Sequence, residues 1–562
     1  MKEVIREAIN DALEELGLSG ADFTVEHPVE LSHGDYATNV AMAVAKSAGK
    51  NPRELADKIA EKLEGQIEYV DKIDVAGPGF INFHLSRDFF VSEVGRVIKE
   101  GEEWGKNNLY ENKFALIEYT SPNLFKPLHI GNLVGNIVGE SLTRLYEFSG
   151  ATVKRLNYPS DIGLTVAKGV WGLRATGGDP SDINALGEAY RFGNEAYESG
   201  DERKDEIVEV NKALYEGSDE TLSSLRERGI ATSRASLNLL LKKLGTIFDA
   251  EIFESEAGPV GIQIVREHIA DGIFKESDGA VIFQGEDYGL HTRVFLNSKG
   301  LPTYEAKDLG NFTLKSDKYP EWTDSLVITG GEQTEYFKVV IAAIRRLFAV
   351  GEEKIIEHIG TGFLTLTTGK MSSRKGNVLT GESLFAEMEE AARERSSDTR
   401  VDDLTTLSEA IAVAALKYQI LRQKVGSNIV FDKAQALSFE GDSGPYLQYT
   451  HARINSVLEK AREAGVSAEV KTENVPPEAY EVEKILYRFP EVVEEAFLAR
   501  EPHQIATFIT ELASSFNSFY ANEKIADSSD PHAPYKCLLA SAVKQTIKNG
   551  LWLLAIKAPE KM

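Results

Sequence analysis

Residues 114–162 read FALIEYTSPNLFKPLHIGNLVGNIVGESLTRLYEFSGATVKRLNYPSDI, and this stretch decides the fold. It opens with a largely apolar, strand-like run, passes through a polar turn, and ends in a second apolar run at 151–158. Between the two runs, apolar residues recur at helical spacing: Val134, Ile137, Val138, Leu142 and Leu145. Strand, helix and strand in this order predict a βαβ unit, which places a bound nucleotide at the carboxyl end of its first strand.

The loop between that first strand and the helix, residues 121–132, contains residue types that suit a triphosphate. A helix N-terminus offers unpaired N–H groups and partial positive charge to an anion. Gly131 lets a ligand approach the backbone, and Lys126 and His129 can donate hydrogen bonds to phosphate oxygens. A histidine before a glycine is more often part of an ordinary loop, so the prediction depends on the βαβ unit around it.

Strand and helix patterns return at the far end of the same region. Residues 324–348 predict a buried strand, a glycine turn and a helix, which is a second βα unit. Between the two units, the charged stretch at 181–245 is expected to be a helical insertion with solvated faces. The predicted fold class is therefore α/β, with a doubly wound, Rossmann-like parallel sheet in a catalytic domain at 109–434.

Two further modules flank this predicted domain. Residues 1–108 alternate helix and strand patterns and predict a small α+β module, whereas residues 435–562 predict an all-α bundle. In the strand-like segment FINFHL, Phe80 and Asn82 project from one face, where a ring and an amide could bind an unpaired base. A half-buried strand edge is the alternative interpretation of these two residues.

Composition limits the classes of function that the chain can serve. A formal net charge of -26 argues against non-specific binding of polyanions, so any nucleic-acid surface must be a local basic patch. The single cysteine, Cys537, cannot form an intrachain disulfide or a multi-cysteine zinc site and suits a reducing cytoplasm. No run of about 18 apolar residues occurs, and the acidic, amphipathic N-terminus is unlike a signal peptide.

A second chemically distinctive stretch is TTGKMSSRKGNVLT at 367–380. It places Lys370, Arg374 and Lys375 within six positions, between two glycines and beside two serines. Such a cationic, donor-rich loop suits closure over a triphosphate and stabilisation of charge on a leaving pyrophosphate, although most loops of this composition are solvated turns. The pattern GxxxxGK[ST] does not occur, which excludes a P-loop enzyme.

Taken together, HIGN at 129–132 and KMSSR at 370–374 resemble the two signatures of class I aminoacyl-tRNA synthetases. Three segments narrow the resemblance to the arginyl-tRNA synthetase family: EYTSPNLFKPLHIGN, GLPTYEAKDLGNF and GKMSSRKGN. HGDYATNVAMAVAK and GPGFINF are similar to its N-terminal module, and GDSGPYLQYTHARINSVLEKA is similar to the start of its helical anticodon-binding domain. The similarity therefore runs nearly from end to end.

The resemblance implies a ligase that activates L-arginine with ATP and Mg²⁺ and transfers the arginyl group to tRNA(Arg), as a cytoplasmic monomer without structural zinc or membrane contact. It implies tRNA contacts for Phe80 and Asn82. Arginine is expected to be bound by Glu118, Asn123, Tyr304, Asp308 and Gln333. ATP is expected to contact His129, Gly131, Asn132, Lys370, Met371, Ser372 and Lys375, and the implied catalytic residues are Lys126, His129, Asn132, Lys370, Arg374 and Lys375.

The chain departs from the family pattern at three places. Asn132 replaces the histidine that usually ends the first signature, and an amide cannot carry charge. Tyr336 stands where the family commonly has histidine. Arg374 and Lys375 share the role of the lysine that usually ends the second signature. Asn132 alone points to a non-catalytic tRNA-binding relative, which is the alternative function. A cysteinyl-type enzyme would need a metal-bound thiolate site that one cysteine cannot build, and a nucleotidyltransferase would not need the helical bundle.

Overall fold

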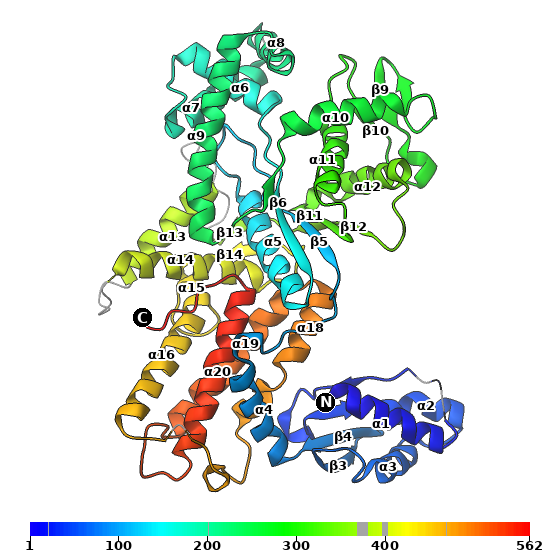
Figure 1. The fold of residues 1–562 in the computed structure, drawn as a ribbon, viewed down its shortest axis with the longest axis vertical. Helices are drawn as coiled ribbons and strands as arrows, with labels where there is room; N and C mark the ends of the chain where they lie inside the picture. Colours follow the sequence, from blue (N-terminus) through cyan, green and yellow to red (C-terminus); the bar gives the residue numbers. More distant parts are fainter. Residues whose placement is uncertain (19, 21, 201, 368–379, 396–402, 468) are drawn as a thin grey trace. The chain divides into compact units, whose positions relative to one another are not determined.

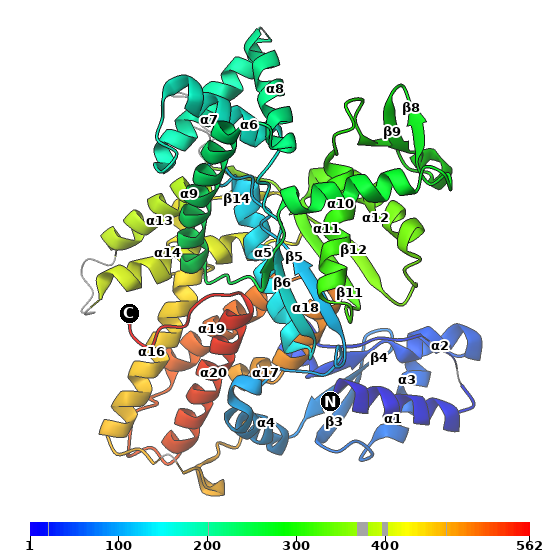
Figure 2. The same ribbon diagram turned by 45° about the horizontal axis from the view of Figure 1, so that its top comes forward.

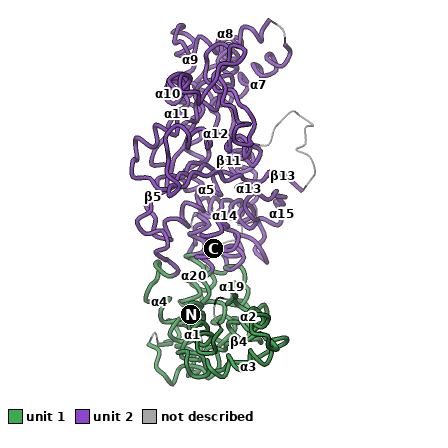
Figure 3. The backbone as a smooth tube through the Cα atoms, turned by 90° about the vertical axis from the view of Figure 1, so that its right-hand side faces the viewer, with its two compact units in different colours: residues 1–104, 450–491, 509–549 green, residues 105–449, 492–508, 550–562 purple. Residues whose placement is uncertain are grey.

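A computed structural model describes residues 1–562 except 19, 21, 201, 368–379, 396–402 and 468. The chain forms two compact units, each assembled from segments that are distant in the sequence (Figure 3). Unit 1 contains residues 1–104, 450–491 and 509–549, and unit 2 contains residues 105–449, 492–508 and 550–562. In the described part of the chain, no helix combines the length and the apolar character that crossing a membrane would require.

A five-stranded parallel sheet forms the centre of unit 2, in the order β12-β11-β5-β6-β7. Because β5 has β6 on one side and β11 on the other, the strand order reverses next to β5, and the carboxyl ends of β5 and β11 flank a crevice. The sheet confirms the predicted α/β class and the first βαβ unit. Its strands are β5 (Phe114–Glu118), β6 (Thr152–Asn157), β7 (Ala250–Glu251), β11 (Asp324–Gly330) and β12 (Ile355–Thr361).

Helices cover both faces of this sheet (Figures 1 and 2). On one face, α5 (Ile130–Phe148) approaches so closely that a Cβ atom at Gly139 would lie 2.4 Å from the Tyr119 ring. On the other, Leu116 and Leu156 share an apolar core with three helices. Those helices are α10 (Glu254–Glu267), α11 (Tyr304–Lys318) and α12 (Thr334–Phe348).

The charged stretch between β6 and β7 is helical, as predicted, but it also has an apolar core of its own. Trp171 and Leu186 belong to that core, and so does Phe125 from the loop after β5. Gly169 and Gly229 admit the Phe125 ring, because a Cβ atom at either position would lie within 2.6 Å of it. The helices are α6 (Leu164–Thr176), α7 (Ile183–Ser199), α8 (Glu202–Glu216) and α9 (Glu220–Leu244).

Smaller elements complete unit 2. An antiparallel sheet, β10-β9-β8, precedes α11, and a short parallel pair, β13 and β14, lies on either side of the second signature loop in sequence. These strands are β8 (Lys275–Ser277), β9 (Ala280–Phe283), β10 (Arg293–Leu296), β13 (Leu364–Leu366) and β14 (Ile429–Phe431). The helices are α13 (Gly381–Arg395), α14 (Leu404–Leu421), α15 (Lys433–Ala436) and most of α18 (Phe489–Ala499).

Unit 1 combines the predicted α+β module with helices from the C-terminal part of the chain. Its antiparallel sheet has the order β1-β2-β4-β3. Arg87 pairs with Glu483 at 2.5 Å, and the Tyr36 hydroxyl donates to Glu491, so ionic contacts join the module to the helices. The elements are α1 (Lys2–Glu15), β1 (Val25–Glu26), β2 (Tyr36–Thr38), α2 (Val40–Ala48), α3 (Pro52–Leu63), β3 (Val70–Ala76), β4 (Phe80–Leu85), α4 (Arg87–Glu100), α17 (Glu481–Leu486), and most of α16 (Gly444–Glu463), α19 (His503–Asn522) and α20 (Ala533–Leu553).

The strand predicted to bind a base is β4. Phe80 is 37% exposed, which leaves its ring available to a partner. Asn82 is only 6% exposed, and it pairs with Ala37 and Asp74 on the neighbouring strands. The two side chains therefore share a face, as the alternation predicts, but only Phe80 is accessible.

Candidate active site

The loop after β5 has a strained backbone. Thr120 and Ser121 adopt φ angles of 76° and 40°, in the left-handed region that a β-branched threonine rarely enters. The Asn132 side chain donates to the Thr120 carbonyl oxygen at 2.8 Å, and Asn136 donates to the Thr120 hydroxyl at 2.9 Å. The residue that departs from the usual first signature, Asn132, thus helps to hold this loop against the start of α5.

His129 is the N-cap of α5. Its Nδ1 atom accepts a hydrogen bond from the Gly131 backbone N–H at 3.1 Å, so the neutral ring carries its proton on Nε2. Partial desolvation, together with the neighbouring Lys126 ammonium, lowers the pKa of the imidazole. At neutral pH the ring therefore offers one Nε2–H donor beside the helix N-terminus.

The segment after the second signature loop is anchored to the first loop. Thr380 forms an antiparallel bridge with His129, and the Gly381 N–H donates to the Leu128 carbonyl oxygen at 2.8 Å. Glu382 accepts from the Leu128 N–H at 2.9 Å. The segment that follows the second signature loop in sequence thus contacts the first loop. The residues assigned to the second loop lie outside the described residues: Lys370, Met371, Ser372, Arg374 and Lys375.

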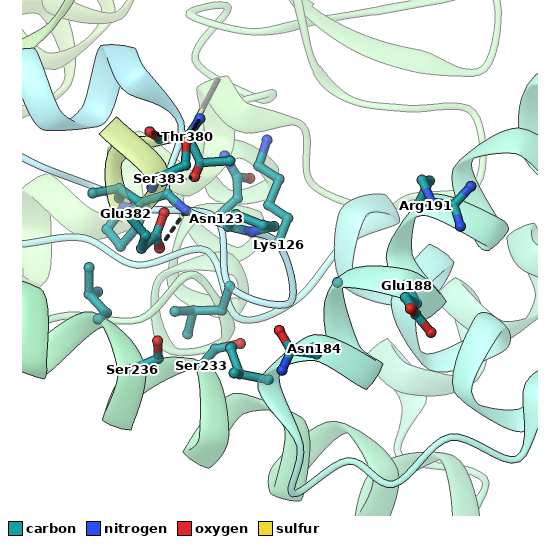
Figure 4. Close-up of a pocket in the computed structure, with 17 residues that line it drawn as sticks. Asn123, Lys126, Asn184, Glu188, Arg191, Ser233, Ser236, Thr380, Glu382 and Ser383 are labelled. Atoms are coloured by element: carbon teal, nitrogen blue, oxygen red, sulfur yellow. Dashed lines mark hydrogen bonds between the residues drawn. The ribbon is translucent and has the colours of Figure 1, made fainter. Parts of the chain in front are cut away.

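A cavity of about 520 Å³ opens between the first loop, helices α7 and α9, and residues 380–383 (Figure 4). Lys126 and Asn123 line it from the loop, and Arg191 lines it from the insertion. Burial and the Lys168 ammonium lower the pKa of Lys126, which pairs with no carboxylate in the described part of the chain. The cavity therefore places cationic and amide donors beside the N-terminus of α5.

Glu118 ends β5 and is only 3% exposed. Its Oε2 atom accepts from the Lys315 ammonium and from the Asn311 amide, each at 2.9 Å. Both partners come from the face of α11 that packs over the sheet. Burial excludes a surface position for Glu118. The sequence analysis did not single out Asn311 and Lys315, although their spacing of three and seven residues from Asp308 places all three on one face of a helix.

Asp308 lies on that same face of α11. The helix begins at Tyr304 with Thr303 as its N-cap, so Asp308 is an interior residue and not a cap. It is half-buried and lines a small cavity, about 20 Å³ in volume, together with Glu118. The Tyr336 hydroxyl donates to its Oδ2 atom at 2.5 Å, which gives a physical role to a second departure from the family pattern.

The electrostatic state of Asp308 differs from that of Glu118. Desolvation, with smaller contributions from Glu118 and Glu254, raises the pKa of Asp308 to about 8, although the Tyr336 hydrogen bond lowers it. Among the described residues, no lysine or arginine forms an ion pair with this carboxylate. Asp308 is thus an acid whose surroundings favour the arrival of a cation.

Three other residues were expected to bind the substrate arginine. They lie around the same crevice but do not share one cavity. Tyr304 is 60% exposed at the start of α11, and its ring lies 5.1 Å from the Lys307 ammonium. Gln333 is exposed in the turn that follows β11. Asn123 lines the larger cavity instead. The structure thus brings Glu118 and Asp308 together at one small cavity, and none of the other three residues lines that cavity.

Comparisons with known proteins agree with this geometry. The family model for the catalytic domain of class I tRNA synthetases of the arginine type matches residues 93–433, and models for the DALR anticodon-binding and arginyl-tRNA synthetase N-terminal domains match residues 447–562 and 2–85. The arginine–tRNA ligase of Clostridium perfringens is 30% identical over 573 residues, covering 100% of both chains. That of Borrelia hermsii is 29% identical over 590 residues, covering 100% of this chain and 99% of the relative.

A solved structure supports the fold over the same length. The arginyl-tRNA synthetase of Thermus thermophilus superposes with a TM-score of 0.79 at 24% identity and covers 100% of both chains. The parallel sheet, the crevice beside β5 and the matched domains define a class I aminoacyl-tRNA synthetase. Within that class, the chain belongs to the arginyl-tRNA synthetase family, whose members join arginine to tRNA. No comparison favours the non-catalytic alternative.

Proposed function

We propose that the acidic pocket formed by Asp308 and Glu118 holds the substrate guanidinium group and that the first loop holds ATP. The observation that carries this proposal is the half-buried carboxylate of Asp308, which has a tyrosine donor but no basic partner among the described residues. A planar guanidinium matches such a carboxylate in charge and geometry. Tyr304 supplies a ring, while Asn123 and Gln333 serve the amino and carboxylate ends of arginine.

Activation then requires positioning more than covalent help from the protein. The arginine carboxylate attacks the α-phosphorus of ATP, and the bond to the β-phosphate oxygen breaks to release pyrophosphate. The His129 Nε2–H, the N–H groups that begin α5 and the Lys126 ammonium stabilise phosphate charge, and Gly131 gives the nucleotide room. Asn132 acts by holding the Thr120 carbonyl. Lys370, Met371, Ser372, Arg374 and Lys375 serve the phosphates from the second loop.

Mg²⁺ would enter with the triphosphate, because this ion retains water and prefers phosphate and carboxylate oxygens. In the part of the chain that the structure describes, no group of three or more histidine, cysteine, aspartate or glutamate side chains could hold a metal ion. The donors of the first loop would therefore hold Mg·ATP through its phosphate groups. The ion would neutralise phosphate charge as the pyrophosphate leaves.

For tRNA, the helices of residues 435–562 are proposed to read the anticodon, and Phe80 is proposed to stack on an unpaired base. The buried position of Asn82 favours a supporting role beneath that ring. A chain of net charge -26 should bind tRNA through local patches, with an affinity that falls steeply as salt rises. We assign the protein to the cytoplasm as a monomer, in agreement with its single free thiol, Cys537.

The decisive experiment is arginine-dependent exchange of pyrophosphate into ATP, measured with and without tRNA carrying an arginine anticodon. Wild-type protein should catalyse exchange in at least one condition, and Asp308→Ala should lose it. Asp317→Asn, an exposed acidic position on the same helix, is the matched control and should retain wild-type activity. Tight tRNA binding without exchange in either condition would instead support the non-catalytic function and direct attention to Asn132.

A further inference from the structure

Tyr158 follows β6 immediately and is 8% exposed. In the sheet register, Leu156 is paired with Glu118 on the parallel neighbour β5, so their side chains project to the same face. Tyr158 lies two residues beyond Leu156 and keeps that face. Its ring packs with Ala257 of α10 and Leu314 of α11. The side chain therefore packs against α10 and against α11, the helix that carries Asp308.

The hydroxyl group of Tyr158 is buried and has no hydrogen-bond partner among the described residues. A buried hydroxyl is nearly always hydrogen-bonded, so an unpartnered one on the sheet face that carries Glu118 needs an explanation. Burial, followed by the carboxylates of Glu254, Asp308 and Glu118, raises the pKa of this phenol well above its usual value. The group therefore stays neutral and keeps both its proton and its acceptor lone pairs.

The three carboxylates near this hydroxyl are not equivalent. Glu118 is paired with Lys315 at 2.9 Å, and Glu254 is paired with Lys307 at 2.5 Å. Only Asp308 lacks a basic partner in the described part of the chain. A guanidinium group brings five N–H donors, and one carboxylate can accept two of them in the bidentate arrangement. The donors left over need a further acceptor inside the pocket.

We propose that Tyr158 is an arginine-specificity residue, whose hydroxyl oxygen accepts an N–H of the substrate guanidinium while Asp308 neutralises its charge. This inference rests on the proposed function, because it requires arginine in the acidic pocket. A planar guanidinium reaches two acceptors at fixed angles, which a compact ammonium group cannot match. Tyr158 thereby adds selection for the shape of the group to the selection for its charge.

The test is Tyr158→Phe, which removes the hydroxyl and keeps the ring in its packing. Because the hydroxyl has no partner among the residues that the structure describes, the melting temperature of the ligand-free variant should be unchanged or slightly higher. In the pyrophosphate exchange assay, the KM for arginine should rise about tenfold, since a hydrogen bond to a charged group is lost. The kcat and the KM for ATP should stay within about twofold of the wild-type values.

Tyr146→Phe provides the opposite pattern as a control. The Tyr146 hydroxyl lies in the same unit and accepts a hydrogen bond from Arg500 at 3.3 Å, outside the pocket. Its removal should lower the melting temperature and leave the KM for arginine unchanged.

Two results would overturn the inference. One is an arginine KM for Tyr158→Phe within twofold of wild type, with normal exchange, which refutes this inference alone. The other is a fall in ligand-free melting temperature like that of Tyr146→Phe, which would make the hydroxyl structural. Wild-type protein without arginine-dependent exchange would refute the proposed function, and this inference with it.

Discussion

Lys417 and Asp308 are both ionisable groups set into unit 2, and the protein treats them in opposite ways. Lys417 on α14 is 0% exposed, and its ammonium donates to the carbonyl oxygens of Leu244 and Ala555, each at 2.6 Å. Leu244 is the last residue of α9, and Ala555 follows the end of α20. Asp308 receives one hydrogen bond, from Tyr336, and no cation from the described residues.

The difference lies in whether the described part of the protein supplies a partner for the buried ionisable group. Lys417 has its hydrogen-bond acceptors within the protein, and carbonyl groups at helix ends carry partial negative charge that suits an ammonium. Burial nevertheless lowers the pKa of Lys417 to about 7. Asp308 has no basic partner among the described residues. Its raised pKa means that ionisation of this carboxyl lowers the stability of the ligand-free protein. The two groups thus differ in their partners: Lys417 has two carbonyl oxygens within the protein, and the proposed function supplies Asp308 with the substrate guanidinium.

The largest expected effect is on arginine activation by Asp308→Asn. Replacing the carboxylate with an amide of equal size removes the charge that the guanidinium needs, so kcat/KM for arginine should fall by about a thousandfold, or roughly 4 kcal/mol. The ligand-free protein should nevertheless melt at an equal or higher temperature above pH 8. A pKa raised in the folded state means that ionisation of Asp308 weakens the fold as pH rises toward 8, and asparagine avoids that loss.

Thermal melts at pH 6 and pH 8.5, with exchange kinetics, test both halves of this prediction. Loss of activity together with a lower melting temperature at both pH values would mean that Asp308 supports the fold, and the contrast with Lys417 would fail.

Lys417→Met should have the next largest effect, and on stability rather than on arginine binding. Methionine keeps the length of the side chain but leaves two buried carbonyl groups without a donor, which should cost about 2–4 kcal/mol. Urea unfolding followed by circular dichroism measures this cost, with the exposed Lys424→Met as the matched control. The KM for arginine should stay within about twofold. A large rise in that KM without loss of stability would contradict a purely structural role for Lys417.

Arginine binding should depend on pH in the direction set by Asp308. In the ligand-free protein the pKa of the Asp308 carboxyl is about 8, and binding of the guanidinium requires the ionised form. The KM for arginine should therefore fall as pH rises from about 6.5 to 8 and then level off. The slope should approach tenfold per pH unit below the pKa. Exchange measured at saturating ATP across this range gives the profile. A flat profile for wild type would show that Asp308 is already ionised in the free protein.

The smallest expected effect is that of Tyr336→Phe. Since the Tyr336 hydrogen bond lowers the pKa of Asp308, its loss should move the KM profile to higher pH and raise the arginine KM about fivefold at pH 7, or roughly 1 kcal/mol. Near pH 9 the variant and wild type should converge, because the carboxyl is then ionised in both. A pH-independent difference would instead indicate that Tyr336 contacts arginine directly. Tyr319→Phe, at the C-cap of α11, is the control.

The sequence allowed much of the fold to be predicted because its signals are local. Apolar spacing and glycine turns located β5, α5, β6, β11 and α12, and the order of those elements implied the parallel sheet. The candidate site was predicted less completely. Glu118, Asp308, His129 and Lys126 were candidates from the sequence, whereas Lys315, Asn311 and Tyr158 were not, since only the packing of the sheet against its helices shows which neighbours those three have.

Sequence alone determined the class of the fold, the family and the positions of both signature loops, because these follow from spacing along the chain and from ordered blocks of residues. Only the tertiary structure decided how buried each ionisable side chain is and which partners it contacts. Glu118 and Asp308 are both carboxylates in recognised segments. Glu118 pairs with Lys315 across the core, whereas Asp308 accepts a hydrogen bond from Tyr336 and pairs with no cation among the described residues. Burial and the choice of partner depend on segments about 200 residues apart in sequence, such as β5 and α11. Local pattern cannot encode that distinction.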